Sequence, residues 1–193
     1  MNRLFLAASL AGAIALAASS SLRAEIKPTA YGVAPGMTQA EAMAILKSVA
    51  RCDVEKEMLD AGYLPSGTYD LYTTCRLNDG HGQLALRTTS SLVGERVAEI
   101  ELLFHSQDLA ETTAEKLAHD YDVAVASAQH VGGEWMWRLS ERVDLTLFIY
   151  PAGDSRAAVL RDTALQQEDT LARNLHSTVS AIGVAGERTG RGG

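Results

Sequence analysis

The chain has 193 residues and a net charge of −7 at neutral pH, and 47% of its residues are hydrophobic. This length suits one domain, or two small and closely packed halves, with enough apolar residues to build a core. The acidic excess, with basic residues scattered along the chain, argues against nucleic acid or an anionic membrane surface as a partner, because both need clustered lysine and arginine.

Residues 1–24 have the pattern of a secretory signal peptide. Arg3 precedes an apolar run from Leu4 to Ala18, and small residues lead to a cleavage site that we place after Ala24, with Ala17 as the alternative. The apolar run is shorter than the roughly 20 residues that a membrane span needs. No cysteine follows the signal directly, so a lipidated amino terminus is not indicated. We expect a mature protein that is periplasmic or secreted, with no stable membrane insertion after cleavage and a net charge of −9, since two arginines leave with the signal.

Cys52 and Cys75 are the two cysteines of the chain. In an oxidising compartment, two cysteines most simply form one disulfide bond, which stabilises a fold by about 3 kcal/mol. The alternative is a redox-active pair, but catalytic dithiols are usually arranged as Cys-x-x-Cys at the start of a helix. These two are far apart in the sequence, so we predict a structural disulfide.

Residues 25–107 predict one helix followed by three strands. Thr38 and Glu41 form a capping box for a helix from Gln39 to Ala50. A polar stretch follows, with a second short helix as the alternative to a loop. Side chains that alternate with a period of two then predict three antiparallel strands, at residues 69–77, 84–89 and 97–105.

The same order repeats over residues 108–165. Thr112 and Glu115 make a second capping box, for a helix that could begin as early as Asp108. Gly132-Gly133 breaks the chain, and alternation predicts three further strands, at residues 135–139, 143–149 and 156–163.

Residues 166–193 follow these two units. Leu171, Leu175, Val179 and Ile182 have the spacing of an amphipathic helix that ends near Gly183, before a mobile tail. The whole pattern predicts an α+β protein with helices packed on an antiparallel sheet, built from two tandem units of one helix and three strands.

Gly36-Met37-Thr38, the capped helix after it, Cys52, and Cys75 within a strand give residues 32–105 a resemblance to the beta-lactamase inhibitor protein and BamE (SmpA/OmlA) superfamily. The resemblance implies a helix that packs on an antiparallel sheet, in two similar halves. The second half departs from it, with no Gly-Met-Thr and no cysteine pair. For function, the resemblance implies one class only, which is non-catalytic binding of another protein.

Motifs of catalysis are absent from the sequence. It has no nucleophile elbow, phosphate-binding loop or dinucleotide fingerprint, and its histidines lack metal-ligand spacing. Glu99 and Glu101 share one face of a predicted strand, about 7 Å apart, which is within reach of paired-carboxylate chemistry. A solvated sheet face is the preferred interpretation. We expect no catalytic residues, no metal and no cofactor.

Aromatic residues supply the candidates for binding a partner. Trp135 and Trp137 lie two residues apart on a predicted strand, so they project from one face, and large aromatics are favoured anchors of interfaces. Burial in the core explains the pair at least as well. If they are core, the exposed candidates are Tyr72, Phe148 and Tyr150 on the opposite strand faces.

The sequence therefore predicts an exported, non-catalytic protein-binding or assembly module of the cell envelope, with an unidentified protein as its partner. The alternative is an inhibitor of a secreted or periplasmic enzyme, and an enzyme of unrecognised type ranks third.

Overall fold

A computed structural model of the chain describes residues 28–59, 64–80, 82–150 and 154–189, and from residue 179 onward it describes only the helical backbone. The signal peptide predicted at residues 1–24 lies outside the described residues. The helices are α1 (Gln39–Leu46), α2 (Ala110–Asp120) and α3 (Thr163–Thr189), with a short 3₁₀ helix η1 (Val125–Ser127). The strands are β1 (Ala50–Met58), β2 (Tyr69–Leu77), β3 (Gln83–Thr88), β4 (Val97–His105), β5 (Gln129–Val131), β6 (Glu134–Arg138), β7 (Val143–Ile149) and β8 (Ser155–Asp162).

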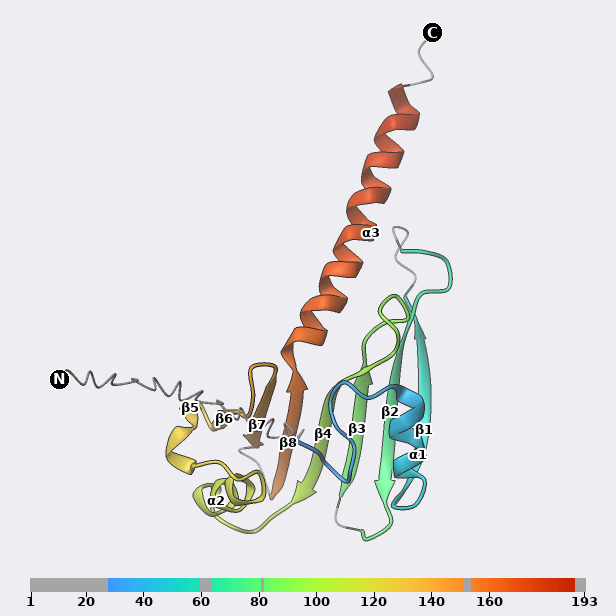
Figure 1. The fold of residues 1–193 in the computed structure, drawn as a ribbon. Helices are drawn as coiled ribbons and strands as arrows, with labels where there is room; N and C mark the ends of the chain where they lie inside the picture. The colour runs from blue at the N-terminus through green and yellow to red at the C-terminus, as the bar shows by residue number, and fades with distance from the viewer. Residues whose placement is uncertain (1–27, 60–63, 81, 151–153, 190–193) are drawn as a thin grey trace, which may run out of the picture.

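All eight described strands form one continuous antiparallel sheet, in the order β1-β2-β3-β4-β8-β7-β6-β5 (Figure 1). The broad α+β prediction agrees with this architecture, but the prediction of two tandem units of one helix and three strands is wrong. Strands β1 and β5 were not predicted from the sequence. The two halves are joined at the centre of the sheet, where β4 pairs with β8 over seven residue pairs. An unpaired strand edge exposes N–H and C=O groups, and joining the two central edges satisfies them.

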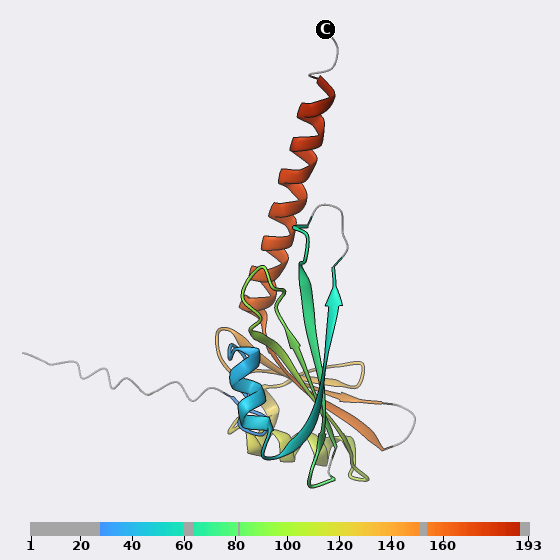
Figure 2. The same ribbon diagram turned by 90° about the vertical axis from the view of Figure 1, so that its right-hand side faces the viewer.

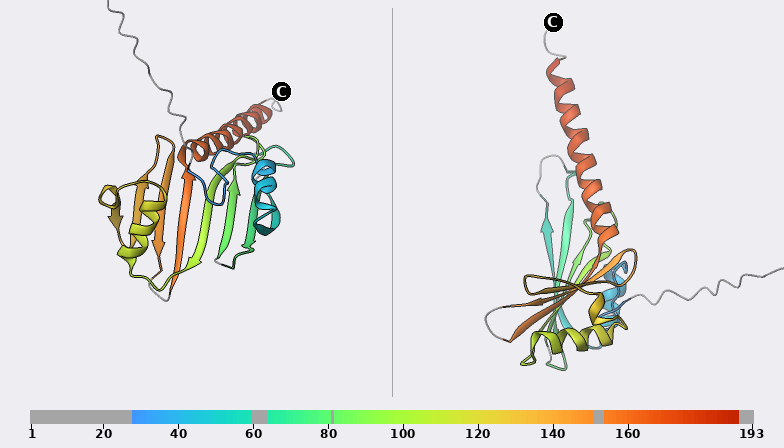
Figure 3. Two further views of the ribbon diagram at one scale, coloured as in Figure 1. Left: turned by 60° about the horizontal axis from the view of Figure 1, so that its bottom comes forward. Right: turned by 90° about the vertical axis from the view of Figure 1, so that its left-hand side faces the viewer.

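The helices α1 and α2 cover the same face of this sheet, as Figures 2 and 3 show from opposite sides. Buried alanines of α1 (Ala42) and α2 (Ala114, Ala118) belong to one apolar core with the strand residues beneath them. The strands contribute mainly branched aliphatic side chains, among them Leu84, Leu86, Ile100, Leu145, Leu147 and Leu160. The opposite face, which we call the open face, has no described helix on it except the first turns of α3.

The capping box predicted for α1 is confirmed. The Glu41 N–H donates to Thr38 Oγ1 at 3.3 Å, and the Thr38 N–H donates to Glu41 Oε2 at 2.8 Å. The helix ends at Leu46, earlier than predicted, because the chain turns at Val49 and enters β1. The side chains of β1 do alternate with a period of two. Acidic residues stand at odd positions, and Cys52, Val54 and Met58 stand at even ones.

The second half differs from its prediction at its helix, whereas the predicted break at Gly132-Gly133 is present as a turn. The helix α2 begins at Ala110, so Thr112 lies inside its first turn and the predicted Thr112–Glu115 box does not cap it. Gly132 and Gly133 have φ angles of 60° and 91° and form the two-residue turn of the β5–β6 hairpin. Positive φ at both positions matches the right-handed twist of the two strands and favours glycine.

The C-terminal helix α3 begins directly after β8. Asp162 caps it by accepting a hydrogen bond from the Leu165 N–H at 3.0 Å. The helix runs to Thr189, beyond the predicted end near Gly183, and its distal turns project away from the sheet (Figure 1). Within the described residues, no helix is both long and apolar enough to cross a membrane.

Candidate functional site

A row of seven polar side chains, six of them charged, crosses the open face from β1 to β6. Strand register places one residue of each strand directly opposite the next, and the side chains of such a row share one face. The members are Glu55, Tyr72, Arg87, Glu99, Arg161, Asp144 and Arg138, which we call the charged row. From Arg87 onward the charges alternate in sign, so each basic residue has an acidic neighbour.

The middle and the far end of the charged row are held by ion pairs. Arg161 Nε donates to Glu99 Oε2 at 2.8 Å, and the Gln166 amide donates to the same oxygen at 3.3 Å. The Arg138 Nε atom lies 2.7 Å from Asp144 Oδ1. These contacts fix the side chains in the half of the row that belongs to β4, β8, β7 and β6.

An apolar patch lies beside the charged row on the same face. Leu103 of β4 pairs with Ala157 of β8, which in turn pairs with Phe148 of β7. Ala157 and its neighbour Val159 of β8 are buried, Leu103 and Phe148 are half-buried, and Met136 of β6 is 36% exposed. We call these five residues the apolar patch. A centre of apolar side chains with charged residues around it is the usual anatomy of a protein interface.

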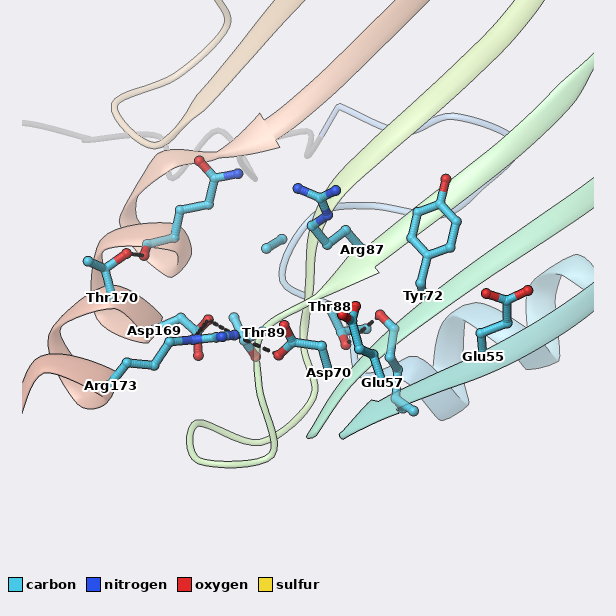
Figure 4. Close-up of a pocket in the computed structure, with 13 residues that line it drawn as sticks. Glu55, Glu57, Asp70, Tyr72, Arg87, Thr88, Thr89, Asp169, Thr170 and Arg173 are labelled. Carbon is cyan, nitrogen blue, oxygen red and sulfur yellow. Dashed lines mark hydrogen bonds and ion pairs between the residues drawn. The ribbon is translucent and has the colours of Figure 1, made fainter. Parts of the chain in front are cut away.

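A groove of about 790 Å³ runs between the first turns of α3 and the open face of β1–β4 (Figure 4). Asp169, Thr170 and Arg173 line it from α3, and carboxylates of β1 and β2 line the opposite side. In Figure 4, Tyr72 and Arg87 project into the space from neighbouring strands.

The α3 wall of this groove is fixed by a network of charged hydrogen bonds. The Arg173 guanidinium donates to Asp169 at 2.7 Å and to Asp70 of β2 at 2.6 Å. Asp169 also accepts from the N–H of Ser90 at 3.0 Å and from its hydroxyl. Desolvation lowers the pKa of Arg173, but the bonds to Asp169 and Asp70 outweigh it and raise the pKa, so this cation is permanent.

On the strand side of the groove, four polar side chains have no partner. Among the described residues, none donates to or accepts from the Arg87 guanidinium, the Tyr72 hydroxyl, or the carboxylates of Glu55 and Glu57. Charged groups on a solvated strand cost little when unpaired, and they remain available to a partner. The groove therefore has one ordered wall and one wall of free polar groups.

Cys52 and Cys75 form the predicted disulfide. They are directly opposite each other in the β1–β2 register, with Cα atoms 4.0 Å apart. The bond lies on the helix-covered face and ties the edge strand to its neighbour. It leaves no free cysteine among the described residues.

Trp135 and Trp137 both point to the helix-covered face. Trp137 is 1% exposed and belongs to the core, whereas Trp135 is half-buried and packs against it. His130, Trp135 and Trp137 stack in sequence, with ring centroids 4.4 Å and 6.3 Å apart. The structure therefore places this pair on the opposite side of the sheet from the groove.

The other three aromatic candidates do not form one cluster. Tyr72 lies in the charged row on β2, and Phe148 lies in the apolar patch on β7, with β3, β4 and β8 between these two strands. Tyr150 follows the end of β7 and is 43% exposed. Tyr72 and Phe148 share the open face, as predicted for strand faces opposite the tryptophans.

Sequence reasoning did not identify Arg87, Asp70 and Arg173 as members of a site. Arg173 meets Asp70 across 103 positions of the chain, so no local pattern predicts this contact. Glu99 was considered only with Glu101 as a carboxylate pair, and its partner proved to be Arg161. The register of strands that are distant in sequence brings these residues together.

Within the described part of the chain, no three His, Cys, Asp or Glu side chains gather as a set of metal ligands.

No protein-family model, curated protein or solved structure matches this chain. The comparisons therefore do not bear on the resemblance drawn from residues 32–105.

Proposed function

We propose that this chain is an exported, non-catalytic protein-binding or assembly module of the cell envelope, and that its open face receives the partner. The observation that carries the proposal is the apolar patch around Phe148, which lies on an uncovered sheet face beside the charged row. Leu103, Phe148 and Met136 of this patch keep part of their surface exposed, and apolar surface with a charged border is what another protein can bury.

Export is supported by two features of different kinds. The signal pattern of residues 1–24 comes from the sequence, and the disulfide between Cys52 and Cys75 comes from the structure. Structural disulfides persist in oxidising compartments and are rare in the cytosol. Together they favour the periplasm or the cell exterior as the place where the protein works.

The charges of the charged row would make the open face selective for one partner protein. Glu99 and Arg161 neutralise each other, as do Asp144 and Arg138, so these pairs contribute a polar border with no net charge. Arg87 is free to pair with an acidic group of a partner. A wrong partner would leave this charge opposite a like charge, which costs binding energy.

Affinity capture from an envelope extract tests the proposal. The bait is mature protein, residues 25–193, and the test variants are Phe148→Ser in the apolar patch and Arg87→Glu in the charged row. Glu115→Lys on α2 is the control, since it also reverses an exposed charge but lies on a helix that covers the opposite face.

We expect the wild-type protein and Glu115→Lys to capture the same protein, and both open-face variants to lose it. If all four baits retain that protein equally, the open face is not its binding surface. If the wild-type bait captures nothing reproducibly, the binding function itself is wrong.

A further inference from the structure

The outer edge of β1 is the longest exposed strand edge among the described residues. This strand has nine residues, while β5 at the opposite edge of the sheet has three. Eight of its nine residues are half-buried or exposed, and Val54 and Met58 are 49% and 53% exposed. A long edge strand with exposed apolar side chains is a template for pairing with another chain.

The hydrogen-bond pattern shows which backbone groups of β1 are unpaired. At the two ends of the β1–β2 ladder, the Asn78 N–H donates to Val49 O and the Leu59 N–H donates to Thr68 O, both at 2.9 Å. Residue pairs in an antiparallel ladder alternate between hydrogen-bonded and non-hydrogen-bonded pairs. The backbone N–H and C=O groups of the odd-numbered residues of β1 therefore point towards β2. The N–H and C=O groups of the even-numbered residues, including Val54, point away from the sheet.

A hollow lies beside this edge on the helix-covered face. It has a volume of about 530 Å³ and lies between α1 and the start of β1, with Met43, Ala44, Ala50 and Cys52 in its lining. Figure 1 shows α1 beside β1 at this edge of the sheet. Even-numbered residues of β1 project to this face, so a strand added to the edge would place every second side chain on the side of the hollow.

The other face of the same edge is acidic. Asp53, Glu55 and Glu57 project to the open face beside a single basic residue of the strand, Arg51, and none of the three carboxylates bonds to another described residue. Side chains of a newly added strand would have Cβ atoms about 5 Å from theirs. Basic side chains would therefore suit this face of the incoming strand, and apolar side chains would suit the face with the hollow.

We propose that the β1 edge binds an extended segment of a partner protein by β-strand addition, and that this segment alternates apolar and basic residues. This inference rests on the proposed protein-binding function and names the chemistry of the partner segment. The main-chain bonds to β1 supply affinity, and the alternating side chains supply specificity.

In the registers that pair the most residues of β1, a second copy of this chain fits the edge less well than a basic segment. When two copies of β1 pair antiparallel about Val54, Asp53 of each copy lies opposite Glu55 of the other. When the symmetry axis of the pair passes through Asp53 or Glu55 instead, the carboxylate of that residue lies opposite the same carboxylate of the other copy. Like charges directly opposite each other destabilise a strand pair.

A synthetic peptide of alternating lysine and valine tests the proposal directly with the full mature protein. Binding is measured by isothermal titration calorimetry, beside a peptide in which glutamate replaces each lysine. Two further peptides carry N-methyl groups on all valines or on all lysines. In an added strand only one of these two sets of N–H groups faces β1, so one methylated peptide should bind like the parent. The other should bind at least about tenfold more weakly, through the loss of several backbone hydrogen bonds.

The matched protein variants are Val54→Pro and Val54→Thr. Proline removes the outward N–H of residue 54 and leaves the bonds to β2 intact, whereas threonine keeps that N–H. We expect Val54→Pro to weaken the lysine–valine peptide at least about tenfold and Val54→Thr to bind as the wild type. Circular dichroism of each variant verifies its folding, and the methylated peptides test the unaltered protein even if Val54→Pro misfolds.

Three outcomes overturn the inference. They are failure of the lysine–valine peptide to bind, equal binding of the glutamate peptide, and equal binding of the two methylated peptides. Dimerisation of the mature protein that Val54→Pro abolishes, seen in sedimentation velocity, would assign the edge to a second copy instead. The proposed function survives each of these results if open-face variants still lose the captured protein, so the two failures are distinguishable.

Discussion

Arg173 of α3 donates a hydrogen bond of 2.6 Å to Asp70 of β2, and this contact fastens the C-terminal helix to the first half of the sheet. Both side chains are about one-quarter exposed, and Asp169 holds the same guanidinium on its other side. This contact helps to set the position of the α3 wall of the groove, together with the bonds from Ser90 to Asp169 and from Gln166 to Glu99.

Replacing Arg173 by glutamine should loosen α3 without unfolding the sheet. We expect the free energy of opening of its first turns to fall by about 1 kcal/mol, because the bonds to Asp70 and Asp169 are partly solvated. Hydrogen exchange of the α3 backbone amides measures this. Arg138→Gln, which removes an exposed pair with Asp144, is the control and should leave α3 unchanged. Equal exchange in both variants would show that other contacts hold the helix.

Removing the disulfide should lower the global stability by about 3 kcal/mol. The change is Cys52→Ala with Cys75→Ala, and urea unfolding compares the double variant with the oxidised wild type. Mass spectrometry of the non-reduced wild type should show the loss of two hydrogens. Two free thiols in the exported protein would contradict the bond.

Replacing Asp162 should clearly lower the stability of the fold, because its carboxylate makes two interactions. It caps α3 through the Leu165 N–H, and its carboxylate also accepts from Arg142 at 3.0 Å while only 4% exposed. We expect Asp162→Ala to cost about 2 kcal/mol. Asp162→Asn keeps an oxygen for the cap and should cost less. Equal unfolding midpoints for alanine and wild type would remove the capping account.

Alkaline pH should destabilise the fold through Tyr121. Desolvation, with a smaller effect of Asp120, raises its pKa to about 12 from a usual value of 10.0. Between these two values the unfolded chain releases a proton that the folded chain retains, so stability falls as pH rises from 10 to 12. Thermal unfolding across this range measures the slope. Tyr121→Phe should flatten it, and an unchanged slope would assign the decline to other groups.

Replacing each of the two tryptophans by alanine should lower the free energy of unfolding by different amounts. Trp137 is fully buried, so Trp137→Ala should cost about 3 to 5 kcal/mol through the cavity it leaves. Trp135→Ala should cost less, because that ring is half-buried. Urea unfolding of both variants gives the comparison. A larger loss at Trp135 would contradict the burial that the structure assigns to them.

The parts of the fold that follow local patterns were predictable. Thr38 and Glu41 stand in the spacing of a capping box, and β4 and β7 alternate clearly enough to predict their extents. The charged strand β1 escaped prediction because only Cys52, Val54 and Met58 mark its apolar side. Charged edge strands carry a weak apolar pattern by nature, since their sides face solvent.

The candidate site was predictable only in part, because its residues meet through long-range pairing. The period-two alternation of side chains predicted that Tyr72 and Phe148 lie on strand faces opposite those of the tryptophans. In the structure both residues lie on the open face. Alternation also puts Arg87 on this face, because Leu84 and Leu86 of the same strand point to the core. Its neighbours in the charged row depend on the register of β3 with β2 and β4, which alternation alone does not give.

Site-specific photo-cross-linking tests the central claim most directly, which is that the open face binds another protein in the cell envelope. A photoreactive amino acid replaces Arg87 or Phe148 on the open face, or Glu115 on α2, in the exported full-length protein. Positions 87 and 148 should each give an adduct with one and the same protein, and position 115 should give none. Adducts from position 115 alone, or from none of the three positions, would contradict the claim.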